Sequence, residues 1–393
     1  MIWSDPDMEP KKERLGRNVV VLTWVSFLQD AASEMLYPVL PLFITSVLGA
    51  PPAVLGLIEG VAEGTASVWK AISGRMADRM RKRPLIFLGY SLSALAKPLI
   101  GLAAGWPLVL VARFVDRTGK GIRTSPRDAL IASDTPAHLR GRAFGLHRSG
   151  DSAGAVVGPL LGLAIYEMVN HELRPLFFAA FVPALLSVAF IARVTEPEQK
   201  PRQSHPAVLG SLPLNFKKVV AFIALFGLIN FSDAFLLLRA SKLGLTFVQV
   251  ILVYVLYNVV YAALSYPAGR VSDRLGRRTV FTLGLGIFSV CYFGLGFVTT
   301  SAWVWVLLPL YGAYTALTDG VSKAWVSDML PQARLGTGLG AFHACFGVAV
   351  LVASLWAGVL WQESGRLPLM ISGVLAAILS ACLLLFGRRL DAV

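Results

Sequence analysis

The sequence predicts an all-α membrane protein whose twelve transmembrane helices form two similar bundles of six. Of its 393 residues, 55% are hydrophobic and only 15% are charged, and the mean hydropathy is +0.65. Soluble domains use about 25% charged residues, whereas a helix that crosses a bilayer needs about 20 predominantly apolar residues. The apolar runs here are long and unbroken rather than alternating, which excludes a membrane-spanning β-barrel.

An internal repeat divides the chain into two halves. Residues 73–83 (SGRMADRMRKR) and 268–278 (AGRVSDRLGRR) both lie between long apolar runs, and they are 195 residues apart, about half the chain. The residues that match at this interval are Gly74 with Gly269, Asp78 with Asp273, and Arg79 with Arg274. In a membrane protein a parallel repeat predicts two bundles around an axis along the membrane normal, with a substrate site between them.

The repeated pattern, Gly-x-x-x-Asp-Arg-x-Gly-Arg-Arg after the second and eighth apolar segments, resembles the loop signature of the major facilitator superfamily of transporters. The second copy keeps every member, but the first has Arg81 at the place of Gly276. A tight glycine turn is therefore expected in the second copy alone. The resemblance implies a gating role for both loops, through the six residues matched above. Because an acid near a helix N-terminus is favoured by the helix dipole, we expect Asp78 and Asp273 to stabilise the gate.

The net charge of +13 is distributed as in a membrane protein rather than a nucleic-acid-binding one. Most Lys and Arg residues fall in alternate segments between the apolar runs, which predicts that these segments and both chain ends are cytoplasmic. We therefore expect a multi-pass protein of the inner (cytoplasmic) membrane. The first 17 residues are polar and lack the apolar stretch of a signal peptide. Cys291, Cys345 and Cys382 lie in apolar runs, and their spacing predicts neither a disulfide nor a metal site.

Five segments are expected along the chain. They are a cytoplasmic tail at 1–17, an N-terminal six-helix bundle at 18–193, a cytoplasmic linker at 194–218, a C-terminal six-helix bundle at 219–386 and a tail at 387–393. The linker is assigned from its polar composition and its prolines.

The apolar runs predict the helices in order. In the N-terminal half they lie at about 18–48, 53–72, 84–104, 107–132, 143–168 and 175–192. In the C-terminal half they lie at about 219–239, 246–268, 279–299, 302–322, 335–361 and 367–386. The first helix is long for one span, and Pro38 and Pro41 should kink or break it.

The fifth helix contains Gly154-x-x-x-Gly158-Pro159-x-x-Gly162, which is similar to a motif common among antiporters of the superfamily. Glycines four residues apart also allow two helices to approach closely. The motif therefore has two interpretations, a role in antiport and helix packing alone.

Ionisable groups near mid-membrane are costly unless paired or hydrated, so they are candidates for function. In the family, helices 1, 4, 7 and 10 line the cavity and helices 2, 5, 8 and 11 flank it, so the resemblance implies two facing walls. The proton-coupling candidates in the N-terminal wall are Asp30, Glu34, Glu59, Glu63, Arg113 and Asp116. The substrate-binding candidates in the C-terminal wall are Asp233, Tyr254, Tyr257, Asn258, Tyr261 and Asp319.

Asp30 is the first choice for the residue that carries a transported proton, with Glu34, Glu59 and Glu63 as alternates. It lies about twelve residues into the first helix, close to mid-depth at about 1.5 Å per residue. A partly desolvated carboxylate binds a proton readily, and a nearby arginine such as Arg113 would favour its release. If the first helix has an eight-residue extension, Asp30 matches Asp233 in the other half. A symmetric structural role for this pair is the main alternative.

The two halves differ in the face that they present. At the interval of 195, Glu59 and Glu63 match Tyr254 and Asn258, so one helical face is acidic in helix 2 and phenolic in helix 8. This predicts that the N-terminal half couples the proton and the C-terminal half selects the substrate. The charged residues nearer the cytoplasmic face are interpreted as topological anchors and loop salt bridges; they are Arg123, Arg127 and Asp128.

Together these features predict a secondary transporter of a small solute that works by alternating access, with a proton as coupling ion and export by antiport favoured. The alternatives are import or uniport of an organic anion or a hard metal cation, and a non-transporting membrane receptor. No His-Glu-x-x-His or nucleotide-binding loop is present, so neither an enzyme nor an ATP-driven pump is expected. We expect a monomer in membrane lipid, without a cofactor, a bound metal or a nucleic-acid partner.

Overall fold

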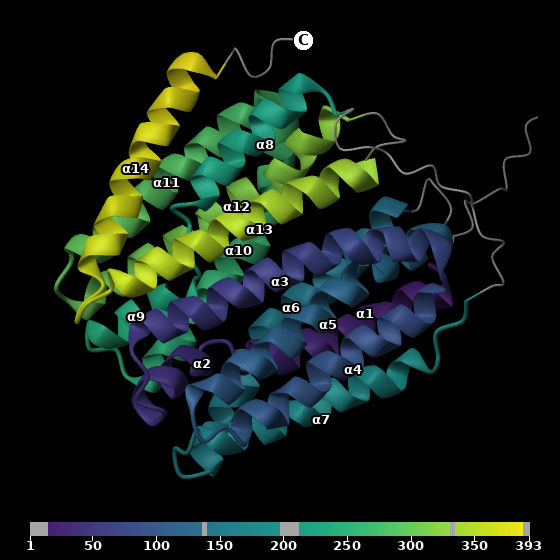
Figure 1. Cartoon of the computed structure of the whole chain (residues 1–393), viewed down its shortest axis with the longest axis horizontal. Coiled ribbons are helices and arrows are strands. Elements are labelled where there is room, and N and C mark those ends of the chain that lie inside the picture. The colour runs from purple at the N-terminus through teal and green to yellow at the C-terminus, as the bar shows by residue number, and fades with distance from the viewer. Residues whose placement is uncertain (1–14, 136–139, 197–211, 331–334, 388–393) are drawn as a thin grey trace, which may run out of the picture.

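The computed structural model describes residues 15–135, 140–196, 212–330 and 335–387 (Figure 1). Within these ranges, the side chains of residues 78, 79, 140–142, 145 and 335–337 are not described. Several predictions therefore lie outside the described residues. They concern the side chains of Asp78 and Arg79, residues 1–14, most of the linker and the end of the C-terminal tail.

Long helices dominate the described part of the chain. Those of the first half are α1 (Arg17–Glu34), α2 (Val39–Leu42), the π-helix η1 (Phe43–Val47), α3 (Pro52–Arg79), α4 (Lys82–Gly101), α5 (Trp106–Ser133), α6 (Arg140–Met168) and α7 (Arg174–Ile191). Those of the second half are α8 (Leu214–Gly227), α9 (Ala234–Lys242), α10 (Phe247–Leu275), α11 (Arg277–Phe297), the 3₁₀-helix η4 (Ser301–Trp303), α12 (Val304–Asp328), α13 (Leu335–Val359) and α14 (Arg366–Phe386). The fold is all-helical, as the sequence predicted.

Helix boundaries confirm the repeat of 195 residues. The matching boundaries are the starts of α2 and α9 (Val39 and Ala234), α3 and α10 (Pro52 and Phe247), α4 and α11 (Lys82 and Arg277) and α6 and α13 (Arg140 and Leu335), and the ends of α7 and α14 (Ile191 and Phe386). Because α2 and α9 begin in register, the first helix has no eight-residue extension. The proposed match of Asp30 with Asp233 is therefore wrong: Asp233 is the N-cap of α9 and matches Pro38, the N-cap of α2.

Both halves interrupt their first span. The predicted break near Pro38 is confirmed, since α1 ends at Glu34 and α2 begins at Val39. The matching break between α8 and α9 was not predicted, because residues 228–233 contain no proline. Side chains satisfy part of the freed backbone there: the amide of Ser232 donates to Ser354 Oγ at 3.1 Å. Backbone N–H and C=O groups outside a helix but within the membrane need such hydrogen-bond partners.

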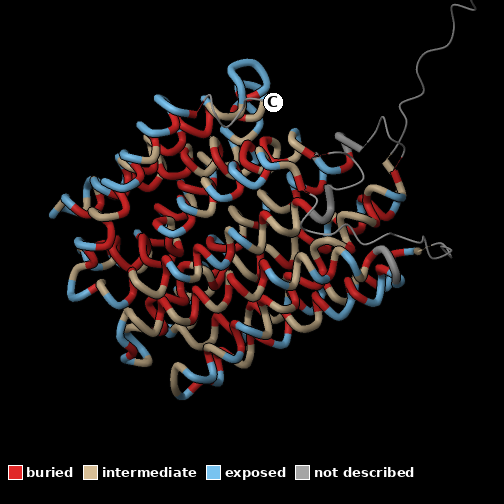
Figure 2. The backbone as a smooth tube through the Cα atoms, turned by 45° about the horizontal axis from the view of Figure 1, so that its top comes forward, coloured by how far each residue is buried: buried red, intermediate tan, exposed pale blue. Residues whose placement is uncertain are grey.

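Several helices have the length and composition of membrane spans. Seven segments of the described chain qualify: Arg17–Val47, Lys82–Gly101, Arg174–Ile191, Phe247–Leu275, Arg277–Phe297, Gly338–Val359 and Arg366–Phe386. Three helices outside this set, α3, α5 and α6, carry many of the charged residues. Large apolar side chains such as Phe87, Leu95, Val182 and Leu384 are more than half exposed, and lipid would cover them. Figure 2 shows exposed residues along the outer edges of the bundle.

The two halves meet along three pairs of elements: α3 with α13, α6 with α10 and α2 with α9. The start of α1 and the segment after α7 share one end of the molecule, since Asn18 Nδ2 donates to the carbonyl of Thr195 at 2.8 Å. We call this the linker end. At the linker end Glu196 accepts hydrogen bonds from the first amides of α4, Lys82 N at 2.8 Å and Arg83 N at 2.9 Å. Glu196 is thus the acid that binds the N-terminus of α4.

Candidate transport site

A buried ion pair lies between α5 and α3. Arg113 Nη2 is 2.6 Å from Glu59 Oε1, and Arg113 Nη1 is 3.5 Å from Asp116 Oδ2. The side chains of Arg113 and Glu59 are 8% and 1% exposed. Taking two charges out of water is costly unless their geometry is good and their other polar atoms are bonded. The second oxygen of Glu59 accepts a hydrogen bond from Ser232 Oγ at 3.2 Å, so the pair is linked to the other half of the molecule.

A second and looser pair lies one helical turn toward the linker end. Arg117 Nη2 is 3.6 Å from Glu63 Oε1, and Arg117 Nε is 3.9 Å from Asp116 Oδ2. The Glu63 side chain is 39% exposed, so solvent screens this pair more than the first. The structure thus brings together four of the six proton-coupling candidates, Glu59, Glu63, Arg113 and Asp116, as ion pairs.

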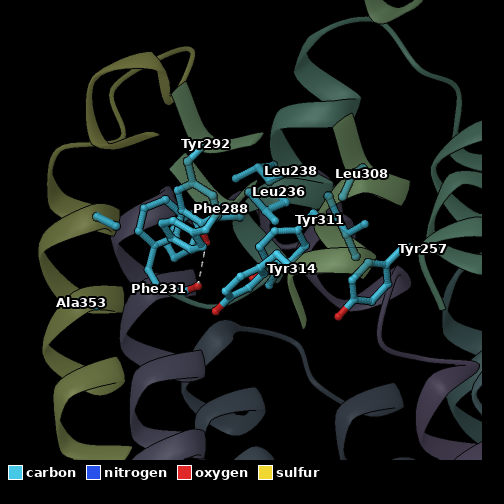
Figure 3. Packing of buried hydrophobic residues seen from close by; sticks show 14 of the residues in the cluster. Phe231, Leu236, Leu238, Tyr257, Phe288, Tyr292, Leu308, Tyr311, Tyr314 and Ala353 are labelled. Atoms are coloured by element: carbon cyan, nitrogen blue, oxygen red, sulfur yellow. Dashed lines mark hydrogen bonds between the residues drawn. The ribbon is translucent and has the colours of Figure 1, made fainter. Parts of the chain in front are cut away.

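Five tyrosine rings form a stacked wall, which we call the tyrosine wall. Tyr254, Tyr257 and Tyr261 lie along α10 with ring centroids 5.6 Å and 6.4 Å apart. Tyr37 stacks on Tyr254 at 5.5 Å, and Tyr311 of α12 stacks on Tyr257 at 5.7 Å. The hydroxyl groups of Tyr257 and its neighbour Tyr314 point away from the leucines of the apolar cluster (Figure 3). Three of the five rings are buried: Tyr254, Tyr257 and Tyr311 are 5%, 6% and 2% exposed.

The hydroxyl groups of the tyrosine wall bind carboxylates. Tyr254 donates to Glu34 Oε2 at 2.6 Å. Tyr311 donates to Asp233 Oδ1 at 2.6 Å, and Tyr257 donates to Asp233 Oδ2 at 3.4 Å. No Lys or Arg of the described residues forms an ion pair with Glu34 or Asp233. These two acids therefore have hydroxyl partners but no paired cation in the described part of the chain.

The remaining two substrate candidates have different surroundings. Asp319 pairs with Lys323 Nζ at 2.7 Å and accepts from Tyr261 at 2.9 Å. Arg148 of α6 donates to the same Tyr261 hydroxyl, so this group also crosses between the halves. Asn258 Nδ2 donates to the carbonyl of Tyr254, on its own helix, at 3.0 Å. Asn258 therefore makes a local contact here.

Asp30 stands apart from Arg113. The arginine that the sequence interpretation placed near it is paired with Glu59 and Asp116 instead. The Cβ atom of Asp30 lies against Gly154 of α6, 3.0 Å from where a Cβ on that glycine would be.

The glycine motif of the fifth helix packs against α1. A Cβ on Gly154 would come within 2.9 Å of the amide nitrogen of Ala31, and one on Gly158 within 3.0 Å of that of Met35. Side chains at these positions would push the helices apart. The motif therefore does pack α6 closely on α1, and this packing accounts for the close approach of Asp30 to α6.

The second gating loop forms a small ionic network at the linker end. Arg277 Nη1 is 2.5 Å from Asp273 Oδ1, and Arg277 Nε is 3.1 Å from Asp328 Oδ2 at the end of α12. Gly276 has φ of +88°, a value that favours glycine. Arg81 in the first loop has φ of −59° and ψ of 134°, so the expected difference between the two turns is confirmed.

The acids and arginines of the two gating loops lie in the last turns of α3 and α10, so the expected N-terminal dipole effect does not come from their own helices. Asp273 is in the last turn of α10, where the helix dipole disfavours an acid; its partner Arg277 is the first residue of α11. Arg274 also lies in the last turn of α10. A Cβ on Gly269 would meet nothing within 4 Å. Gly74 lies inside α3, and a Cβ on this residue would be 3.7 Å from Ser125 Oγ.

Sequence reasoning missed several buried polar groups of the first half. Arg123 is 5% exposed, donates to Ser93 Oγ at 2.5 Å and lies over the ring of Tyr90 at 4.5 Å. Arg127 donates to Ser26 Oγ at 3.1 Å. The nearness of both arginines to a helix end did not reveal that α1 and α4 cover them, although Arg127 does form an expected salt bridge, with Asp128 Oδ1 at 3.0 Å. Lys97 and His147 are each 4% exposed.

A polar site between two helical bundles, crossed by hydrogen bonds from both, defines this protein as a secondary transporter. The model of the Major Facilitator Superfamily matches residues 22–238 and again residues 219–392, once for each half. The chain belongs to this superfamily of transporters, which are not enzymes, and it is a multi-pass membrane protein.

Known relatives and structures agree with this assignment. The chain is 35% identical over 384 residues to the uncharacterized MFS-type transporter MJ1317 of Methanocaldococcus jannaschii, covering 95% of each. It is 25% identical to the multidrug resistance protein MdtG of Proteus mirabilis, over 72% of this chain and 74% of that protein. Its fold is similar to that of the POT family transporter PepTSo (TM-score 0.79, 12% identity, 96% and 99% covered) and of the nucleoside transporter NupG (TM-score 0.74, 12% identity, 94% and 98% covered).

Proposed function

We propose that this protein is a proton-coupled antiporter that exports amphipathic organic cations across the cytoplasmic membrane. The observation that carries the proposal is the tyrosine wall with Glu34 and Asp233, two acids without a paired cation among the described residues. An organic cation over an aromatic face gains about 0.5 to 2 kcal/mol, and a carboxylate nearby adds Coulomb attraction. The wall thus combines aromatic rings with unbalanced negative charge.

Two further observations support export of this class of compound. The similarity to MdtG favours efflux, since that relative is named a multidrug resistance protein. The glycine motif of α6 has the pattern found among antiporters. The import of a hard metal cation has less support, because the described residues contain no group of three His, Cys, Asp or Glu side chains that could hold a metal ion.

In this proposal the two bundles, 18–193 and 219–386, rock against each other in alternating access, and the protein works as a monomer. The first half couples the proton at Asp30, while the tyrosine wall of the second half selects the substrate. The contact of α2 with α9 closes the end opposite the linker. The linker end and both termini face the cytoplasm, so the substrate would enter there and the proton would leave there.

Transport by the wild-type protein tests the substrate class. In proteoliposomes with an acidic lumen, we expect uptake of permanent organic cations such as tetraphenylphosphonium and ethidium, and none of fluorescein or Mn²⁺. Asp233→Asn should weaken the apparent affinity for the cations about tenfold, equivalent to about 1.4 kcal/mol. Asp319→Asn is the matched control and should have less effect, because Lys323 already balances that acid. Uptake of the anion, or equal affinities in the wild type and Asp233→Asn, would contradict the assignment.

The second gating loop should control the rate of transport rather than affinity. Asp273→Asn removes one carboxylate from Arg277, and the pair is exposed (62% for the Asp273 side chain), so it stabilises one conformation by about 1 kcal/mol or less. We expect turnover to fall about two- to fivefold with an unchanged dissociation constant for ethidium. Asp328→Asn, which removes the other carboxylate on Arg277, should act similarly. Unchanged turnover in both variants would remove this role.

A further inference from the structure

A second cluster of polar groups lies between Asp30 and the linker end, entirely within the first half. His147 Nε2 is 2.8 Å from Ser26 Oγ, and the same hydroxyl is 3.1 Å from Tyr90 OH. Arg127 Nη1 donates to this hydroxyl at 3.1 Å. The other ring nitrogen, His147 Nδ1, is 3.6 Å from Asp151 Oδ2. Side chains of four helices, α1, α4, α5 and α6, therefore meet at the Ser26 hydroxyl beside a buried histidine.

The cluster continues to Asp30 through the contact of α1 with α6. These two helices run in parallel, because Gly150 of α6 packs on Thr23 of α1 and Gly162 packs on Met35. Asp151 lies three residues before Gly154, the residue that touches Asp30, so the two acids are on facing sides of the contact. His147 and Ser26 each lie four residues nearer the linker end than Asp151 and Asp30. The four side chains form two successive layers, about 6 Å apart along the helices.

Asp151 has an unusual environment for a carboxylate. Its Oδ1 atom is buried and has no hydrogen-bond partner in the described part of the chain. Its one ion-pair partner there is His147, at a distance longer than a hydrogen bond. Two carboxyl groups side by side in a buried position cannot both ionise at low cost, so they tend to share one proton. Asp30 packs on Gly154, one helical turn from Asp151, so the two carboxyl groups are neighbours in the contact of α1 with α6.

Resting on the proposed proton coupling, we propose that Asp151 and His147 form the path by which a proton moves between Asp30 and the linker end. The proton on the Asp30 carboxyl passes to the Asp151 carboxylate, which breaks one O–H bond and forms another. His147 then takes the proton at Nδ1 and gives the one on Nε2 to Ser26 Oγ, while the Ser26 hydroxyl passes its own proton to solvent water at the linker end, so the ring and the hydroxyl are neutral before and after. An imidazole suits this step because its two nitrogens can accept and donate together.

Charged groups of both signs lie around His147. Arg127 approaches from α5, Arg148 follows in α6, and both disfavour a lasting imidazolium; Asp128 and Asp151 act in the opposite sense. Tyr90 of α4 bonds Ser26 but does not lie between the two layers. Histidine here is thus placed to pass a proton on rather than to hold it.

The test uses the full-length protein in proteoliposomes with tetraphenylphosphonium as the probe. His147→Gln keeps an amide near Ser26 but cannot relay a proton, and Asp151→Asn removes the intermediate acceptor. We expect both variants to lose at least tenfold in uptake driven by an acidic lumen, while exchange of labelled for unlabelled cation without a pH gradient stays within about twofold. Imidazole in the buffer should partly restore gradient-driven uptake in His147→Ala. Tyr90→Phe is the control and should retain coupled uptake.

The outcomes separate the relay from the antiport mechanism. If the wild type couples and Asp30→Asn does not, full gradient-driven uptake in His147→Gln and Asp151→Asn would overturn the relay alone. Equal loss of exchange and coupled uptake without rescue by imidazole would also overturn it, since that result indicates a structural role. Indifference of the wild type to the pH gradient would overturn the proposed coupling itself.

Discussion

Replacing Arg113 with alanine should abolish transport and lower the stability of the protein more than other single changes in the site. The change leaves Glu59, which is 1% exposed, without its cation at 2.6 Å. Removing one partner of a buried ion pair costs about 3 to 5 kcal/mol, because the remaining charge is buried and unpaired. We therefore expect an apparent melting temperature in detergent several degrees below that of the wild type, and transport of tetraphenylphosphonium at background.

Two control variants separate charge from packing in this result. Arg117→Ala breaks a longer pair, 3.6 Å from an exposed partner, and should destabilise the protein by about 1 kcal/mol or less. The double variant Glu59→Leu, Arg113→Met replaces both charges with apolar groups and should regain most of the stability without regaining transport. An Arg113→Ala protein with the stability and transport of the wild type would contradict the role of this pair.

Asp30→Asn should uncouple transport from the pH gradient. Asparagine has nearly the shape of the protonated acid but cannot release a proton, so the variant resembles one fixed protonation state. Gradient-driven accumulation of tetraphenylphosphonium should fall at least tenfold, while exchange across a membrane without a gradient continues. The matched control is Glu34→Gln, whose carboxylate accepts from Tyr254 in the tyrosine wall and should affect affinity instead. Full accumulation by Asp30→Asn would move the coupling role to Glu59 or Glu63.

The sequence was sufficient to predict the all-helical fold, since repeats and apolar runs are local patterns. The interval of 195 residues places α3 and α10, and α4 and α11, in register to the residue. The break before α9 could not be predicted, because no proline marks it and its support comes from the hydroxyl of Ser354, more than one hundred residues away. The comparison of the two halves therefore assumed an eight-residue extension of the first helix and wrongly matched Asp30 with Asp233.

The sequence predicted which residues belong to the candidate site better than it predicted which of them pair. The charges of α3 and α5 were identified from their cost in a membrane, and the structure pairs Arg113 with Glu59 and Arg117 with Glu63. Which acid an arginine binds depends on helix rotation and packing, and residue spacing alone does not define either. The cluster around His147 joins four helices, so no single segment of sequence contains its signal. A histidine near a helix end gave no hint of burial.

Proton movement driven by the substrate is the most direct test of antiport coupled at Asp30. Proteoliposomes would contain a pH-sensitive dye and have equal pH on both sides, and tetraphenylphosphonium would be added outside. An antiporter takes the cation in and releases a proton, so the lumen of wild-type vesicles should become alkaline. Vesicles with Asp30→Asn should show no such change. No alkalinisation with the wild type during measurable cation uptake, or the same alkalinisation with Asp30→Asn, would contradict the account.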